Sequence, residues 1–173
     1  GLIPSLTAGR ADIAVSAIYI TPERQQVVNF TQPYLAGGLV ALVKEGNSTI
    51  NSAEDLKGKK ISVQTGTKSV EWLHTHIPDA QTVEVEKNQQ MFNLVSIGRV
   101  DAAVTGKPAA FQYARTRGGV KILPGSLTSE EYGIAVRKDE AALVGEMNDA
   151  LKQLKADGSY QQLVDKWFPN PVK

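Results

Sequence analysis

Apolar and polar residues alternate along the chain with two periods, which predict helices and strands in turn. Leu143, Met147, Leu151 and Leu154 are three or four positions apart, as on one face of a helix. Short unbroken apolar runs predict strands buried on both faces, as in parallel sheets. The alternation predicts an α/β protein with mainly parallel sheets. After a first helix and strand, strands are expected at 27–30, 39–43, 60–64, 83–85, 101–104, 121–123 and 132–136, and helices at 52–56, 69–76, 88–97, 107–115, around 143–154 and from Ser159.

A near-repeat of seven residues begins at Gly9, as Gly-Arg-Ala-Asp-Ile-Ala-Val, and again at Gly98, as Gly-Arg-Val-Asp-Ala-Ala-Val. Each copy follows an amphipathic helical stretch, and glycine ends a helix well because it adopts the left-handed cap conformation at little cost. The apolar run after the aspartate predicts a short buried strand. One helix–strand unit therefore occurs twice, which predicts two similar α/β lobes and a ligand cleft; a chance match of so short a motif is the alternative.

Composition removes several classes of function. Of the 173 residues, 42% are hydrophobic and 21% charged, so the chain can bury a core. A net charge of +1 gives no electrostatic footprint for nucleic acid, and no apolar run approaches the ~20 residues of a membrane span. Cysteine is absent, and His74 and His76 point to different faces of one helix. We therefore expect no metal and no cofactor.

Several longer motifs occur in a fixed order, and together they are specific. They are residues 11–15, 20–24, 28–34, 55–61, 64–67, 132–136, 154–160 and 166–168. In this order they resemble the bacterial extracellular solute-binding proteins for polar amino acids, such as the glutamine- and lysine/arginine/ornithine-binding proteins. The resemblance implies a two-lobed, type II periplasmic-binding-protein-like fold. It also implies an ABC import system, in which a polar amino acid or related small carboxylate binds in the inter-lobe cleft and a membrane permease is the partner. The implied location is the periplasm, or the cell surface of a Gram-positive source through a membrane anchor.

Family members carry a strand–helix–strand segment before the position of Gly1, on the order of 40–50 residues, in line with a βαβ unit of ~30 or more. The resemblance therefore implies an incomplete first lobe, residues 1–38 plus 132–173, and a complete second lobe, residues 39–131. Either a companion N-terminal fragment or a second copy exchanging strands is then a possible partner. A truncated, self-associating fragment that binds no ligand is one alternative function.

The first lobe carries the predicted anchor for a ligand carboxylate. A guanidinium binds a carboxylate through two parallel hydrogen bonds. In the family the arginine of a Thr-x-x-Arg motif does this, and the resemblance assigns the role to Arg24, with main-chain groups at Ala17 and Tyr19. From the residues alone, a solvated surface arginine on a short helix is the favoured interpretation of Arg24, and the match to the family motif reverses this preference.

The second lobe supplies the predicted turn around Gly66, Thr67, Lys68 and Ser69, which resembles the family's carboxylate-binding turn. Helix N-termini present free N–H groups and a positive dipole end to anions. The Thr67 hydroxyl is expected to contact the ligand. The alternative is that Thr67 is a plain N-cap of the following helix, and both interpretations can hold. Gln64 lies where the family varies its side-chain selectivity.

Gly106 departs from the family pattern, which places an aspartate there as partner of the ligand's ammonium. An unpaired ammonium at a buried site costs several kcal/mol. Glu130 or Glu131 could substitute, although both also read as exposed loop acids. The second alternative function is an enzyme resembling cyclohexadienyl dehydratases, which need a general acid in the cleft. The missing acid at Gly106 argues against it, and we expect no catalytic residue and no enzyme.

Overall fold

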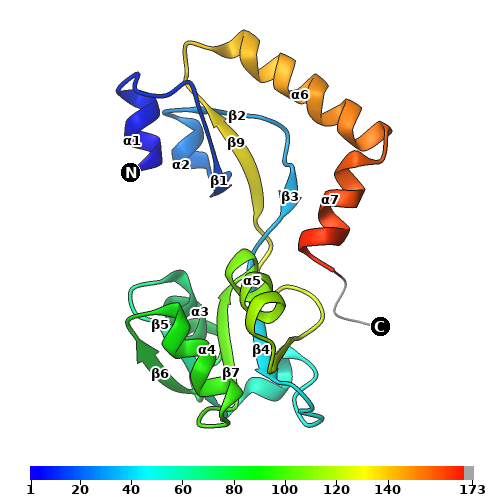
Figure 1. Cartoon of the computed structure of the whole chain (residues 1–173). Coiled ribbons are helices and arrows are strands. Elements are labelled where there is room, and N and C mark those ends of the chain that lie inside the picture. The colour runs from blue at the N-terminus through cyan, green and yellow to red at the C-terminus, as the bar shows by residue number, and fades with distance from the viewer. Residues whose placement is uncertain (170–173) are drawn as a thin grey trace. The chain divides into compact units, whose positions relative to one another are not determined.

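The protein, represented by a computed structural model that describes residues 1–169, forms two compact units (Figure 1). Unit 1 contains residues 1–37 and 129–166, and unit 2 contains residues 38–128 and the segment from Trp167 onward. Trp167 and Phe168 group with unit 2, although the predicted first lobe includes them, because they pack on Arg115 and Phe111 of unit 2. Residues 170–173 of that predicted lobe lie outside the described residues.

Unit 2 is built on a five-stranded sheet in the order β6-β5-β7-β4-β8. β5 pairs in parallel with both β6 and β7, whereas β4 pairs antiparallel with β7 and β8. The strands are β4 (Leu39–Lys44), β5 (Lys60–Gln64), β6 (Gln81–Val85), β7 (Ala102–Gly106) and β8 (Val120–Ile122). The helices are η1 (Ala53–Leu56), α3 (Lys68–His76), α4 (Asn88–Ser96) and α5 (Lys107–Arg117). These elements follow the predicted pattern closely, and β6 lies at one end of the order of the described strands.

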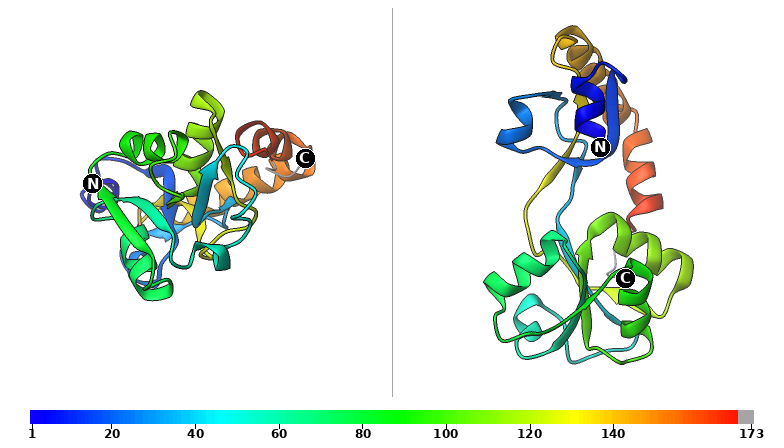
Figure 2. Two further views of the ribbon diagram at one scale, coloured as in Figure 1. Left: turned by 90° about the horizontal axis from the view of Figure 1, so that it is seen from below. Right: turned by 90° about the vertical axis from the view of Figure 1, so that its left-hand side faces the viewer.

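Helices cover both faces of the unit 2 sheet (Figure 2). Alternate residues of β4 separate the two layers, because successive side chains of a strand point to opposite faces. Ala41 and Val43 pack with Leu73 of α3 on one face, whereas Leu42 packs with Phe92 of α4 on the other. Both faces of the sheet are therefore buried, as the apolar runs predict.

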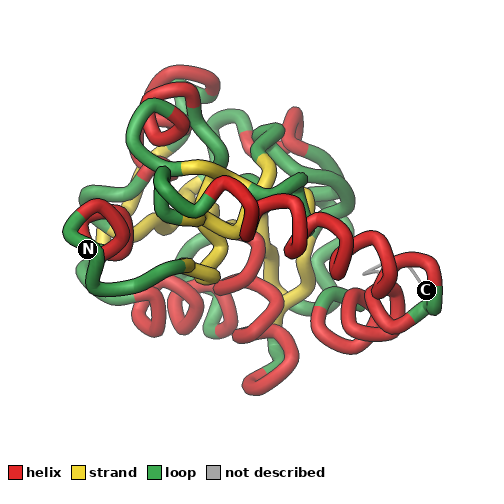
Figure 3. Tube along the Cα trace, turned by 90° about the horizontal axis from the view of Figure 1, so that it is seen from above, coloured by secondary structure: helices red, strands yellow, loops and turns green. Residues whose placement is uncertain are grey.

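Unit 1 contains a smaller sheet in which β9 (Glu131–Val136) pairs with each of the other strands that the structure describes there. β1 (Ile13–Tyr19), β2 (Asn29–Phe30) and β3 (Leu35–Ala36) each pair antiparallel with β9. The helices are α1 (Leu2–Thr7), α2 (Pro22–Gln25), α6 (Ala141–Ala156) and α7 (Ser159–Trp167). α1 lies alongside β1 (Figure 2), and α6 runs along the outside of the strands (Figure 3). The expected strand at 27–30 is shorter, because Val27 and Val28 close the turn after α2 through hydrogen bonds to the Arg24 carbonyl.

The α/β class is confirmed. Parallel pairing, expected for most strands, joins β5 to β6 and β7, whereas β4 and β9 pair antiparallel with their neighbours. One expectation for the strands needs correction. The first copy of the repeat does not form a doubly buried strand: Ile13 is 39% and Val15 57% exposed. Only one side of β1 has a neighbouring strand in the described chain.

The repeat motif has the same structural role in both units. Gly9 has φ of +70° and Gly98 φ of +74°, so both end a helix in the left-handed conformation, as predicted. The aspartate then holds the neighbouring strand. Asp101 accepts the Lys60 N–H at 2.8 Å through Oδ2 and donates its own N–H to the Lys60 carbonyl. Asp12 forms an ion pair with Arg137, at the end of β9, at 3.3 Å.

Candidate functional site

Arg24 lies in the short helix α2, whose start follows the predicted pattern. The Thr21 hydroxyl accepts the Arg24 N–H at 3.3 Å, and Pro22 occupies the first helical turn. The guanidinium is half-buried, and its Nη1 donates to the Tyr19 carbonyl at 2.8 Å. This bond fixes the direction of the side chain while using one of its five N–H groups. The remaining donors form the planar fork that suits a carboxylate.

Arg24, Ala17 and Tyr19 line one open pocket of unit 1, with a volume of about 510 Å³. Ser16, Ile18 and residues 1–4 at the start of α1 complete the lining. We call Arg24, Ala17 and Tyr19 the first half-site. The structure thus brings together the three residues that the resemblance assigns to the first lobe.

Ala17 lies in a bulge of β1. Ala14 pairs with Ala135 and Ile18 with Gly133, so the register of the two strands skips residues 15–17. Ala17 has φ of +49°, the one positive value for a non-glycine residue within residues 1–169. Its N–H points away from the ladder and donates to Tyr34 Oη at 3.2 Å. Bulges commonly redirect groups next to binding sites.

Tyrosines surround the first half-site, and only Tyr19 among them was expected there from the sequence. Tyr19 stacks on Tyr132 with ring centroids 5.0 Å apart and planes 7° apart. Tyr34 tilts against Tyr132 at 6.4 Å, and Tyr160 Oη donates to the Tyr34 carbonyl. Burial raises the pKa of Tyr34, and the hydrogen bond from Ala17 opposes this rise only in part. Tyr34, Tyr132 and Tyr160 all stand inside family motifs, which is the signal that could have identified them.

The predicted residues of unit 2 lie at the turn between β5 and α3. Thr67 is the N-cap residue of α3, as expected, and its hydroxyl donates to the Gln64 carbonyl at 2.7 Å. The Thr67 side chain makes no capping hydrogen bond, and its contact with a ligand stays a prediction. Gln64 Nε2 donates to the Glu86 carbonyl at 3.0 Å. Lys68 is the first residue of α3. Gln64 and Thr67 are held by these local hydrogen bonds, and the N-terminus of α3 receives no hydrogen bond from the Thr67 side chain.

The sheet order brings this turn to the same edge as Gly106. β5 and β7 are adjacent and parallel, and each is followed by a helix, α3 and α5. The chain runs from β5 through α3 to β6, which pairs with one side of β5, whereas β7 pairs with the other side of β5. Ligands of open α/β sheets bind where neighbouring connections diverge in this way, at the carboxyl ends of the strands. We call Gln64, Thr67, Lys68 and Gly106 the second half-site.

Gly106 is the N-cap of α5, with φ of −64° and ψ of 141°. A Cβ atom placed on Gly106 would have no heavy atom within 4 Å beyond its chain neighbours. The position therefore has room for a side chain and leaves α5 without a side-chain cap. The two acids considered as substitutes, Glu130 and Glu131, belong to unit 1, where their carbonyls accept the N–H groups of Gly37 and Ile20.

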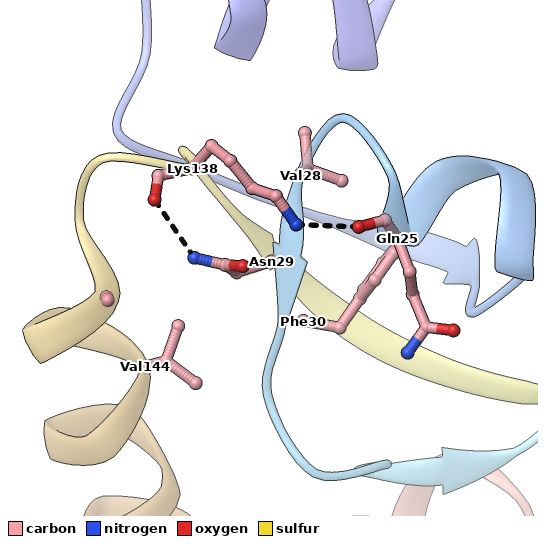
Figure 4. A pocket seen from close by; sticks show the side chains of 7 residues that line it. Gln25, Val28, Asn29, Phe30, Lys138 and Val144 are labelled. Carbon is pink, nitrogen blue, oxygen red and sulfur yellow. Dashed lines mark hydrogen bonds between the residues drawn. The ribbon is translucent and has the colours of Figure 1, made fainter.

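A second pocket of unit 1, of about 390 Å³, contains none of the predicted residues (Figure 4). Its polar groups bond to one another: Lys138 Nζ donates to the Gln25 carbonyl at 2.7 Å, and Asn29 Nδ2 donates to the Lys138 carbonyl at 3.2 Å. Val144 of α6 lies on the opposite wall. These bonds tie the corner after α2 to the start of α6, which is a structural role.

The residues described include no cluster of three or more potential metal ligands. His76 bonds to the Trp72 carbonyl through Nδ1 at 3.0 Å and stacks on the same indole, so it has a local role in α3. Among residues 1–169, no helix combines the length and apolar character needed to cross a bilayer.

Comparison with known proteins identifies the family. The signature of the bacterial extracellular solute-binding proteins, family 3, matches residues 1–170, and the chain belongs to this family. The ABC transporter arginine-binding protein 1 of Escherichia coli (strain K12) is 35% identical over 173 residues, which cover 97% of this chain and 70% of that protein. The glutamine-binding protein GlnH of Bacillus subtilis (strain 168) is 35% identical over 167 residues, which cover 96% of this chain and 61% of that protein.

A solved structure of an ancestral cationic amino acid solute-binding protein has a TM-score of 0.88 at 41% identity, covering 97% of this chain and 74% of that one. The two-lobed, type II periplasmic-binding-protein-like α/β class is thereby confirmed. The chain spans between 61% and 70% of the length of the two curated relatives.

Proposed function

We propose that this protein is the solute-binding component of an ABC import system and binds a polar amino acid or related small carboxylate. The observation that carries the proposal is the first half-site. Arg24 is anchored on the Tyr19 carbonyl at 2.8 Å, beside the Ala17 bulge, in one pocket. A guanidinium held in a fixed direction suits the carboxylate that all amino acids share, and Ala17 and Tyr19 line the same pocket. The relatives, which are named for binding arginine and glutamine, support the same ligand class.

The second half-site supports the proposal from unit 2. Its turn and the starts of α3 and α5 lie at the carboxyl ends of two adjacent parallel strands, where such sheets bind ligands. Gly106 has no side chain that could pair with the ammonium of a ligand. The proposal therefore includes ligands that lack a charged ammonium. That the ligand binds in a cleft between two lobes stays a prediction.

The proposed setting follows from the family. We place the protein in the periplasm, or on the cell surface through a membrane anchor in a Gram-positive source, with a membrane permease as its partner. We also propose that the 173-residue chain forms homo-oligomers or combines with a companion fragment, because β1 has a strand neighbour on one side only within the described residues.

Calorimetric titration of the 173-residue chain with a panel of amino acids and their α-keto analogues tests the function. Binding of at least one member is expected, with loss of binding on Arg24→Ala. A parallel assay of prephenate turnover tests the enzyme alternative. Turnover would contradict the binding role, and the absence of any binding across the panel would favour a fragment without ligand. The relatives favour binding, because both are named as transport binding proteins.

A further inference from the structure

The chain passes from unit 1 into unit 2 at Gly38 and returns to unit 1 after Thr128. Leu39, the first residue of β4, pairs with Gly106, the last residue of β7. Gly38 directly precedes this pair in the sequence. The first passage of the chain between the units therefore lies beside the second half-site.

Gly38 is bonded to the start of α5. Its carbonyl accepts the N–H of Lys107, the first residue of α5, at 3.0 Å. Gly38 is buried and has φ of +109°, a value that residues other than glycine rarely adopt. Because φ and ψ are the two soft dihedrals of a residue, they set the direction of this carbonyl. A change in the Gly38 backbone therefore breaks the bond or moves the first turn of α5.

Thr128 holds the same place from the second passage. Its Oγ1 accepts the Leu39 N–H at 2.8 Å, and the Leu127 N–H donates to the Leu39 carbonyl at 2.7 Å. Leu39 is 4% exposed, and a buried N–H that loses its acceptor is costly. The Thr128 hydroxyl therefore fixes the residue that pairs with Gly106. We call Gly38, Leu39, Lys107 and Thr128 the crossing corner.

We propose that the crossing corner couples ligand binding at the second half-site to the backbone of both passages, with Gly38 and Thr128 as positioning residues. A ligand held at Gly106 and the first turn of α5 favours the same arrangement of α5 that the Gly38 carbonyl and Leu39 require. Such coupling is reciprocal: the corner tightens ligand binding by the factor by which the ligand stabilises the corner. The inference rests on the proposed amino-acid-binding function and adds two residues outside both half-sites.

The first test is Thr128→Val, which keeps the branched shape and removes the hydroxyl acceptor. The probe is the member of the calorimetric panel that the parent binds best, beginning with L-arginine and L-glutamine, for which relatives are named. We expect Thr128→Val to bind about 3- to 10-fold more weakly, the range of one hydrogen bond, and Thr128→Ser to bind like the parent. The matched control is Thr116→Val, which removes a hydroxyl bonded to the Gln112 carbonyl on α5 and should leave affinity unchanged.

The second test is Gly38→Ala, because alanine disfavours the φ of +109° that directs the carbonyl to Lys107. Weaker binding is expected here too. The control is Gly46→Ala, which places the same strain at φ of +82° where an added Cβ has no heavy atom within 4 Å. Gly46→Ala should leave affinity unchanged.

Hydrogen exchange separates coupling from a loss of stability. Exchange is measured relative to the Ile77 amide, which donates to the Leu73 carbonyl at 2.8 Å in the same unit. In the parent, a saturating probe should slow exchange of the Lys107 and Leu39 amides at least 3-fold on this scale. In Thr128→Val, the Leu39 amide should exchange faster without probe, and the probe should protect Lys107 less than in the parent.

These readouts separate the outcomes. Equal binding by Thr128→Val and the parent overturns the inference and leaves the proposed function standing. Weaker binding with exchange at Ile77 raised as much as at Leu39 also overturns it, because the loss then reflects the stability of unit 2. A probe that binds the parent without protecting Lys107 does the same. If the parent and the variants bind no member of the panel, the proposed function fails and the inference fails with it.

Discussion

The two copies of the seven-residue repeat begin strands with opposite surroundings. β7 lies between β5 and β4, and Val104 is fully buried. Within residues 1–169, β1 pairs with β9 alone, and Val15, at the same position of the repeat, is 57% exposed. The glycine cap is nevertheless alike in both units, and each aspartate contacts the neighbouring strand, Asp101 through the Lys60 N–H and Asp12 through an ion pair with Arg137. Local sequence therefore sets how a strand starts, whereas the strands beside it decide whether it is buried.

The largest expected effect of this difference is self-association. An open strand edge with apolar side chains recruits other chains, and β1 combines such an edge with exposed Ile13 and Val15. We expect the 173-residue chain to associate at micromolar concentration, which corresponds to about 8 kcal/mol. Sedimentation velocity over a concentration series measures this. A single monomeric species that unfolds cooperatively, with protected amides in residues 132–169, would show that unit 1 closes without a partner.

A charge placed at the equivalent positions tests the difference in burial directly. Val104→Asp puts a carboxylate into the core of unit 2 and should destabilise that unit by about 4 kcal/mol or more. Val15→Asp should change the free energy of unfolding by no more than about 0.5 kcal/mol and should weaken self-association. Urea unfolding followed by circular dichroism compares the two. Similar losses for both variants would mean that β1 is buried in solution.

The comparison extends to the half-sites, and Arg24 tests the one in unit 1. Arg24→Ala should weaken ligand binding by about 1.5–3 kcal/mol, the range of a hydrogen bond to a charged group. The control is Arg10→Ala, which removes an exposed arginine of the repeat and should leave affinity unchanged. Calorimetric titration provides both values, and equal curves for Arg24→Ala and the parent would remove Arg24 from the site.

Gly106 tests the half-site in unit 2, with a smaller expected effect. The position has open space and caps α5, so Gly106→Asp should fit and bind an α-ammonium, tightening binding about 3- to 10-fold. Gly106→Asn provides the same cap without the charge and should not tighten binding. A parent that binds as tightly as Gly106→Asp would show that another group holds the ammonium.

The elements of unit 2 were predictable because their boundaries carry local signals. The capping box of Ser52 and Asp55 forms as its spacing predicts, and Gly98 ends α4 in the left-handed conformation. In unit 1 the same signals place α1 and the start of α2, but they carry no information about the neighbours of β1. Its exposure and its bulge at Ala17 depend on pairing with β9, more than 110 positions later in the sequence.

The parts of the two half-sites also differ in how far a sequence motif can predict them. Tyr19 and Arg24 meet because they flank one short turn, which a motif can predict. The tyrosines around them are scattered from position 19 to position 160 and meet only after the sheet of unit 1 has formed. The sequence places Thr67 at the N-cap of α3, but the bond from its hydroxyl to the Gln64 carbonyl depends on the geometry of the turn.

The contact between Asp101 and Lys60 has a consequence for how unit 2 folds. β5 and β7 are parallel and separated by β6 and two helices, so their pairing must wait for a long loop to close, which is slow. A slip by one residue would turn every buried side chain of the strand to the opposite face. Asp101 exchanges two hydrogen bonds with Lys60, one of them through its side chain, and only the native register satisfies both. The aspartate of the repeat thus favours the native register, because strands that pair out of register lose both of its hydrogen bonds.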